Sequence, residues 1–367
     1  MKRILVMSFG TDAGGIEKSL IEFLKFLLKE GHEVDLYLWR KPGVLYDMIP
    51  KAVNILNFKL NPGSLRNSKT LKDFVWYLQL RIAKALNNPV RCFRPFPKGP
   101  YDIAISYCQN GYSPYYIIDK VDATKKIMFY HHGSYDVTGR GKKLDEKHYL
   151  MYDRFVTVSD SNRLMLESHF SKMIGHIDVI YNLVDEEGIK KLADEPCEIK
   201  PSEKLKLCTV GRISPEKGQI LAIETAKILA EGGLDFIWYF VGDGSDRFKC
   251  ENLVKEYKLQ DRCIFVGMKS NPYPFIKICD FYVQPSHVEA DPVTIREAKV
   301  LGKHIITTNI AAFEEALSAG KLGIICNENA KSLSNGILSA VDGNCPKSSL
   351  EERVNTQTEH QLRKLLE

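Results

Sequence analysis

Short apolar runs and stretches with helical spacing alternate along this chain, and the alternation predicts its fold class. Residues 4–9 form an apolar run with the length of a buried strand. Residues 16–30 place apolar side chains at a period of 3.6, which predicts an amphipathic helix, and residues 33–39 predict the next strand. A strand, a helix and a strand in succession predict a parallel, doubly wound sheet.

The same alternation continues along the chain. In the first half we predict further strands at residues 53–58, 102–108, 126–130, 155–159 and 177–181, and a helix at 161–170. In the second half we predict strands at 206–210, 236–241, 263–266, 281–284, 305–308 and 323–326. Helices are predicted between them at 219–231, 247–257 and 274–279, and from Asp291, as the helix cap, to about residue 301. The pattern therefore predicts a second doubly wound parallel sheet.

The chain has 367 residues, which favours two domains over one. We predict an α/β protein with a Rossmann-like domain at residues 1–185 and another at 205–348. Residues 186–204 are acidic, contain two prolines and lack sustained periodicity, which indicates a linker between them.

Composition bounds the class of protein. Hydrophobic residues make up 44% of the chain and charged residues 26%, as in a soluble globular protein. No apolar run approaches the roughly 20 residues that span a bilayer, and residues 4–7 are too short for the core of a signal peptide. Nine cysteines without a C-x-x-C pair indicate reduced thiols in a cytosol, and no His/Cys spacing predicts a metal site.

The net charge of +5 hides a local excess of basic residues. Residues 59–98 contain nine basic residues and one acidic residue, together with Trp76, Tyr77, Phe93 and Phe96. Three interpretations stay open: a solvated helix face over a core stripe, a surface for anionic lipid headgroups, or a nucleic-acid surface. No recognised nucleic-acid module accompanies the segment, so nucleic acid is not the expected partner.

Two carboxylates stand at special places around the predicted helix that follows the strand at 281–284. Glu289 lies in the preceding loop, Pro292 suits the first helical turn, and Glu297 lies one turn into the helix. Backbone N–H groups at a helix N-terminus bind phosphate, and carboxylates accept hydrogen bonds from sugar hydroxyls. This arrangement favours a polyhydroxylated anion as the ligand.

The spacing of Glu289 and Glu297 resembles the E-x7-E motif of the family-4 glycosyltransferases, which have the GT-B fold of two facing Rossmann-like domains. The segment V-G-R-I-S-P-E-K-G at residues 210–218 resembles a second motif of that family. By this resemblance Arg212 and Lys217 meet the donor diphosphate, and the helix after Pro292 and Val293 assists them.

Other segments add to the resemblance. Gly14-Gly15-Ile16-Glu17-Lys18 is similar to a glycine turn that approaches donor and acceptor, although a plain tight turn explains it equally well. His131 or His132, with His131 favoured by register, is similar to a histidine near the donor sugar; a structural histidine is the other interpretation. The segments 182–185 and 266–268 are similar to the domain junction and to the loop at the nucleotide base, the latter implicating Gly267 and Met268. Residues 359–367, within a C-terminal segment at 349–367, resemble the family's terminal helix, which returns to the first domain.

The resemblance implies a retaining glycosyltransferase of hexosyltransferase type with a nucleotide-diphosphate sugar donor, a UDP-sugar being favoured. It implies that Glu297 binds ribose, that Glu289 binds and positions the sugar, and that His131 orients the acceptor. It implies no cofactor and no metal. The favoured acceptor is a polyprenyl-diphosphate saccharide of cell-surface polysaccharide synthesis, met by a cytoplasmic enzyme on the inner face of the membrane.

One departure from the family pattern concerns the donor sugar. Glu289 is followed by Ala290 and Asp291 where the family has a glycine and then an aromatic or small residue. Two other classes stay open: a GT-B nucleotide-sugar epimerase or phosphorylase, and a non-catalytic nucleotide-sugar-binding subunit. A free epimerised sugar or a phosphate-dependent product would identify the first.

Overall fold

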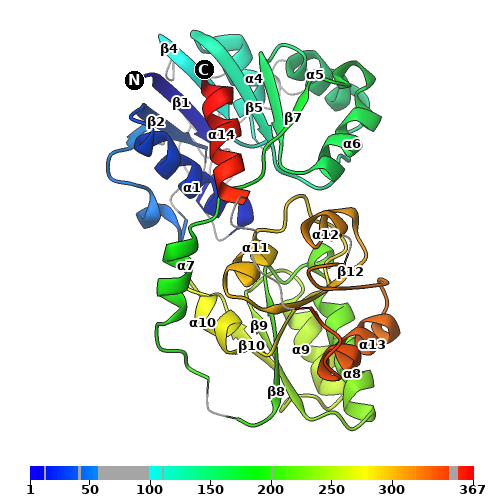
Figure 1. Ribbon diagram of the computed structural model, residues 1–367. Coiled ribbons are helices and arrows are strands. Elements are labelled where there is room, and N and C mark those ends of the chain that lie inside the picture. The colour runs from blue at the N-terminus through cyan, green and yellow to red at the C-terminus, as the bar shows by residue number, and fades with distance from the viewer. Residues whose placement is uncertain are drawn as a thin grey trace, which may run out of the picture. The chain divides into compact units, whose positions relative to one another are not determined.

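The computed structural model describes residues 1–11, 14–39, 43–56, 99–109, 111–199, 202–318, 320–346 and 354–367. The chain forms two compact units. The first unit comprises Met1–Leu183 and Gln357–Glu367, and the second unit comprises Val184–Thr356. Each unit is built on one parallel sheet (Figure 1).

The sheet of the first unit has seven strands in the order β3-β2-β1-β4-β5-β6-β7. The strands are β1 (Arg3–Ser8), β2 (Glu33–Leu38), β3 (Asn54–Leu56), β4 (Tyr101–Ser106), β5 (Ala123–Tyr130), β6 (Arg154–Thr157) and β7 (Ile177–Val179). The order reverses between β1 and β4, which makes the carboxyl ends of these strands a topological switch point, where open α/β sheets bind ligands.

Helices cover both faces of this sheet (Figure 1). One apolar core joins the strands to α1 (Gly15–Lys29) and to α14 (Val354–Leu366). The other joins them to α4 (Ser113–Lys120), α5 (Gly139–Tyr149) and α6 (Asp160–His169). Two short 3-10 helices, η1 (Tyr46–Met48) and η3 (Ser171–Met173), complete the described helices of this unit.

The second unit repeats the architecture with six strands in the order β10-β9-β8-β11-β12-β13. These are β8 (Leu205–Val210), β9 (Phe236–Val241), β10 (Cys263–Gly267), β11 (Phe281–Gln284), β12 (His304–Thr308) and β13 (Ile324–Cys326). The switch point lies between β8 and β11. The two doubly wound parallel sheets predicted from the apolar pattern are therefore confirmed.

The helices of the second unit also form two layers. One core holds α8 (Gln219–Glu231), α9 (Arg247–Glu256) and α13 (Ala330–Val341) against the sheet. The other holds α10 (Tyr273–Ile278), α11 (Val293–Val300) and α12 (Ala311–Ala316). The β8–α8 connection contains the 3-10 helix η4 (Pro215–Lys217).

The first part of the predicted linker is helical, since Glu186–Ala193 forms helix α7. Asp185 begins this helix, since its Oδ1 accepts a hydrogen bond from the Gly188 N–H at 2.9 Å. Only Ile189 and Ala193 of the helix are buried. The apolar residues Ile189, Leu192 and Ala193 have helical spacing, but the helix spans only eight residues, so the period is not sustained in the sequence and the helix was not predicted.

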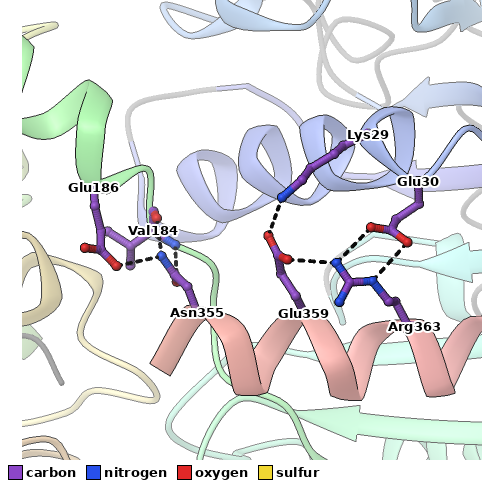
Figure 2. A network of polar contacts seen from close by, with 7 residues as sticks. All are labelled: Lys29, Glu30, Val184, Glu186, Asn355, Glu359 and Arg363. Atoms are coloured by element: carbon purple, nitrogen blue, oxygen red, sulfur yellow. Dashed lines mark hydrogen bonds and ion pairs between the residues drawn. The ribbon is translucent and has the colours of Figure 1, made fainter. Parts of the chain in front are cut away.

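The C-terminal helix α14 begins at Val354, before its predicted start at residue 359, and lies along α1 (Figure 2). Glu359 pairs with Lys29 at 2.9 Å, and Arg363 pairs with Glu30 at 3.0 Å. Leucines of α14 enter the core of the first unit: Leu362, Leu365 and Leu366. These contacts fix the returning segment to the first unit.

The basic segment at residues 59–98, with its four aromatic residues, lies outside the described residues. Within the described residues, none of the helices is long and apolar enough to cross a membrane.

Candidate functional site

The turn between β8 and α8 carries the predicted diphosphate motif, and it is held by one glutamine. Gln219 Nε2 donates to the Arg212 carbonyl at 2.9 Å, and Gln219 Oε1 accepts from the Ser214 N–H at 3.3 Å. Gln219 is buried, whereas Arg212 is exposed. The buried Gln219 thus fixes the backbone of the turn, while the Arg212 side chain is accessible to solvent.

Gly218 brings this turn against the loop that follows β11. Its φ of +69° lies in the left-handed region, and a Cβ at this position would lie 1.9 Å from the Pro285 carbonyl oxygen. The His287 N–H then donates to the Glu216 carbonyl at 2.8 Å. Only glycine permits this close approach, which joins two segments about 70 residues apart in the sequence.

The close approach brings Lys217 and Glu289 together. Lys217 Nζ lies 2.7 Å from both Oε1 and Oε2 of Glu289. The Lys217 side chain is 25% exposed and that of Glu289 is 9% exposed. The predicted site therefore contains a largely buried carboxylate in direct contact with a partly buried ammonium group.

A chain of hydrogen bonds fixes the Glu289 carboxylate from the other side. Ser286 Oγ donates to Glu289 Oε1 at 2.8 Å, and Gln284 Nε2 donates to Ser286 Oγ at 2.8 Å. The Tyr282 hydroxyl donates to Gln284 Oε1 at 2.7 Å. Tyr282, Gln284 and Ser286 are buried on or just after β11, so the sheet itself positions the carboxylate.

Glu297 lies on α11 with only 1% of its surface exposed, and the Tyr273 hydroxyl donates to its Oε1 at 3.1 Å. Pro292 is the residue that precedes α11, and Val293 begins it. The predicted capping role of Asp291 is wrong: the cap position is Pro292, without a capping side chain, and Asp291 Oδ1 accepts from Arg296 Nε at 2.9 Å. Arg296 of α11 forms a nearly buried ion pair with Asp291, so this carboxylate does not cap the helix.

Gly267 and Met268 lie at the carboxyl end of β10. Gly267 has a φ of +81°, and its carbonyl accepts from the Gly242 N–H at 2.9 Å. Met268 is 51% exposed. The glycine turn at 242–246 connects β9 to α9. Its carboxylate Asp243 pairs with Arg247 at 3.0 Å. No group of three potential metal-ligating side chains occurs among the residues that the structure describes.

The first unit places its predicted residues at the carboxyl ends of β1 and β5. Gly14 is the cap position before α1 and Gly15 begins the helix, and the Glu17 carboxylate lies close to Gly14. A Cβ on Gly14 would lie 2.2 Å from Glu17 Oε2, so a larger residue here would displace the end of the Glu17 side chain. Its backbone at φ −144° is ordinary extended chain.

His131 follows β5 and is only 6% exposed. Its ring centroid lies 4.7 Å from that of Tyr107 and 5.9 Å from that of Phe129. Burial lowers the pKa of His131 to about 3, so the imidazole is neutral at physiological pH. Neither ring nitrogen has a hydrogen-bond partner within the described part of the chain. His132, by contrast, is exposed and contacts Ser134 through its ring.

The structure thus brings Lys217, Glu289 and the flanking turn of Arg212 into one place in the second unit. Sequence reasoning missed the supporting side chains Ser286, Gln284 and Tyr273. The first two stand at alternate positions before Glu289, which is a signal of a shared strand face. Tyr273 has no local signal, because it reaches Glu297 from another helix.

Two family models match the chain, and together they span nearly all of it. The model described as glycosyl transferases group 1 matches residues 193–361, and the model described as glycosyltransferase family 4 matches residues 13–187.

Curated relatives match over part of the chain. The uncharacterized glycosyltransferase MJ1059 of Methanocaldococcus jannaschii is 27% identical over 168 residues, which are 44% of this chain and 41% of that protein. The O-antigen biosynthesis glycosyltransferase WclY of Escherichia coli is 29% identical over 144 residues, 38% of this chain and 39% of that protein. The N-acetylgalactosamine-N,N'-diacetylbacillosaminyl-diphospho-undecaprenol 4-alpha-N-acetylgalactosaminyltransferase of Campylobacter jejuni is 22% identical and covers 56% of this chain and 55% of that enzyme. The chain therefore spans less than two thirds of the length of each of these relatives.

Solved structures match over the whole chain at low identity. The Anabaena protein HepE in complex with UDP superposes with a TM-score of 0.70 at 14% identity, covering 99% of both chains. A glycosyltransferase from Rickettsia africae superposes with a TM-score of 0.69 at 21% identity, covering 99% of this chain and 93% of that one. These neighbours confirm the predicted GT-B fold.

Proposed function

The chain belongs to the group 1 glycosyltransferases, and on this premise we propose that it transfers a hexosyl residue from a UDP-sugar to a saccharide acceptor with retention of configuration. The observation that carries the proposal is the 2.7 Å contact of Lys217 Nζ with both carboxylate oxygens of Glu289. It joins a phosphate-binding cation to a hydroxyl-binding carboxylate, the two chemistries that a nucleotide-sugar needs side by side.

Different residues bind different parts of the donor in this proposal. Arg212 and Lys217 hold the diphosphate, together with the N–H groups at the start of α11 near Pro292 and Val293. Glu297 accepts from the ribose hydroxyls and Glu289 from the sugar hydroxyls. Gly267 and Met268 offer backbone to the base, and Gly14 and Gly15 let the main chain approach the donor.

The chemistry proceeds by stabilising the leaving group. As the glycosidic bond breaks, negative charge grows on the UDP diphosphate, and the fixed cations Arg212 and Lys217 stabilise it more in the transition state than in the substrate. The acceptor hydroxyl attacks from the face that the diphosphate leaves, and a diphosphate oxygen takes its proton. His131, neutral in this environment, donates or accepts a hydrogen bond to orient sugar and acceptor.

The acceptor is a saccharide on a polyprenyl diphosphate in cell-surface polysaccharide synthesis. The name of the Campylobacter relative, which acts on a diphospho-undecaprenol saccharide, supports this class of acceptor. The basic and aromatic composition of residues 59–98 supports a peripheral contact with the anionic inner face of the membrane.

The test begins with a panel of nucleoside diphosphates and nucleotide-sugars, read by thermal shift and calorimetry. Product analysis with candidate lipid-linked acceptors follows. Lys217→Ala is expected to lower kcat/KM about 100- to 1000-fold, corresponding to roughly 3–4 kcal/mol of transition-state stabilisation. The matched control is Lys331→Ala, which removes an exposed lysine from α13. Wild-type kcat/KM in Lys217→Ala would remove this residue from the site, and a free epimerised sugar or a phosphate-dependent product would replace the proposed reaction.

A further inference from the structure

The ion pair between Lys217 and Glu289 engages two groups that the proposed function assigns to different parts of the donor. Both oxygens of the carboxylate lie 2.7 Å from Nζ, so Lys217 faces the whole carboxylate and not one edge of it. Within the described ranges, Nζ makes no other hydrogen bond or ion pair. The ammonium group has three N–H donors and two of its contacts go to Glu289, so a diphosphate that takes more than one donor must compete with the carboxylate.

Glu289, unlike Lys217, has a second and independent support. Ser286 Oγ donates to its Oε1 at 2.8 Å, and Ser286 is fully buried. The chain through Gln284 to Tyr282 anchors that hydroxyl to β11. When the ammonium group turns away, the carboxylate keeps a hydrogen bond that holds its position.

We propose that the donor diphosphate opens this ion pair, and that Ser286 is the positioning residue that keeps Glu289 in place during the exchange. Lys217 exchanges the carboxylate for phosphate oxygens, which carry more charge than one carboxylate. Glu289, still held by Ser286, then accepts hydrogen bonds from the sugar hydroxyls. The carboxylate thus becomes available to the sugar only when a diphosphate has arrived. This inference rests on the proposed function and adds an order of events to it.

The proposal has a measurable consequence for binding of the nucleotide alone. When the binding-competent form is a fraction of the population, the apparent affinity falls by that fraction. A pair that is closed in about nine molecules of ten would weaken diphosphate binding about tenfold. Glu289→Gln keeps the shape and the hydrogen bond to Ser286 but removes the charge that holds Lys217. We therefore expect UDP and inorganic pyrophosphate to bind Glu289→Gln about tenfold more tightly, while transfer is slowed.

Two matched variants separate this effect from a general loss of negative charge. Glu328→Gln removes a carboxylate that pairs with His287 on the neighbouring loop, and we expect UDP affinity to stay within twofold of wild type. Glu297→Gln removes a carboxylate assigned to ribose, and we expect it to weaken UDP binding and leave pyrophosphate binding unchanged. Tighter UDP binding by Glu289→Gln together with weaker UDP binding by Glu297→Gln is the result that identifies the exchange.

The role of Ser286 has its own readout. Ser286→Ala is expected to lower kcat about tenfold with UDP affinity within twofold of wild type, because the diphosphate contacts remain and the sugar contact loses its support. Ser286→Thr, which keeps the hydroxyl, is expected to recover most of kcat. Melting temperatures of all variants are measured alongside, so that a loss of folding is recognised as such.

The measurements are isothermal titration with UDP and pyrophosphate, and transfer kinetics with the donor that the wild type uses. Unchanged or weaker UDP and pyrophosphate binding by Glu289→Gln, with the wild type binding UDP and transferring sugar, would overturn the exchange and leave the proposed function standing. Failure of the wild type to bind any nucleoside diphosphate would overturn both.

Discussion

His131 allows a quantitative test of the structure of the first unit, because its burial predicts how the free energy of unfolding depends on pH. The imidazole is almost fully buried between Tyr107 and Phe129, and burial lowers its pKa from 6.5 to about 3. In the unfolded chain the same ring has its ordinary pKa. Between pH 6.5 and 3 the unfolded state therefore binds a proton that the folded state does not, so stability falls as the pH is lowered through this window.

The magnitude follows from the linkage relation. Above pH 6.5 the ring is neutral in both states and has no effect on stability. Within the window the folded state loses about 1.4 kcal/mol per pH unit from this group. Between pH 7.5 and pH 5.0 the expected loss is about 2 kcal/mol. His131→Phe keeps an aromatic ring against Tyr107 and Phe129 but cannot bind a proton, so it is expected to lose about 2 kcal/mol less than the wild type over this range.

The assay is urea unfolding of the full chain at pH 7.5 and pH 5.0. All other titratable groups contribute equally to both proteins. The loss of unfolding free energy between the two pH values in the wild type, minus the same loss in His131→Phe, is therefore the contribution of His131. The control is His132→Phe, which makes the same replacement at the neighbouring exposed histidine. Parallel stability curves for wild type and His131→Phe, or an NMR titration of the His131 ring with a midpoint near 6.5, would refute the reasoning. In the proposed function, a ring that is neutral above pH 5 would act as a hydrogen-bonding group and not as a cation.

Three further predictions concern the second unit, the effect of removing metal ions and the membrane. Gly218→Ala forces a Cβ toward the Pro285 carbonyl oxygen at a left-handed φ, and we expect it to cost about 1–3 kcal/mol by urea unfolding and to reduce activity; a variant with wild-type stability and activity would contradict the proposed close approach. Activity is expected to survive EDTA, since in the proposed function Arg212 and Lys217 supply the positive charge at the diphosphate, whereas complete loss restored by Mg²⁺ or Mn²⁺ would show that a metal takes part. Co-sedimentation with anionic vesicles is expected to fall at high salt and in a variant with serine at four basic positions of residues 59–98, and equal binding to neutral vesicles would favour a soluble acceptor. The four positions are Arg81, Lys84, Arg91 and Arg94.

The strands were predictable because a buried parallel strand is a continuous apolar run. Strands β9 (Phe236–Val241) and β11 (Phe281–Gln284) and helix α8 (Gln219–Glu231) coincide with their predicted bounds. Helix α5 escaped prediction for the opposite reason. Its buried residues include Asp145 and His148, and four of its eleven residues are lysine or arginine, so no apolar period marks it. The Asp145 carboxylate is buried because the hydroxyls of Tyr115 and Tyr135 donate to it, a tertiary contact that local sequence does not reveal.

The site was predictable as a set of residues and not as an arrangement. Both motifs could be assigned to the carboxyl ends of strands, since each follows an apolar run and precedes a helix. Their adjacency depends on β8 and β11 being neighbours, with Phe281 opposite Leu207, and strand order is not encoded in any local pattern. The contact of Lys217 with Glu289 depends further on the missing Cβ of Gly218. The sequence motifs alone suggest an unpaired cation that binds phosphate beside an unpaired carboxylate that binds sugar. In the structure each of the two is the other's partner, and in the proposed exchange this pairing would set the order in which the parts of the donor bind.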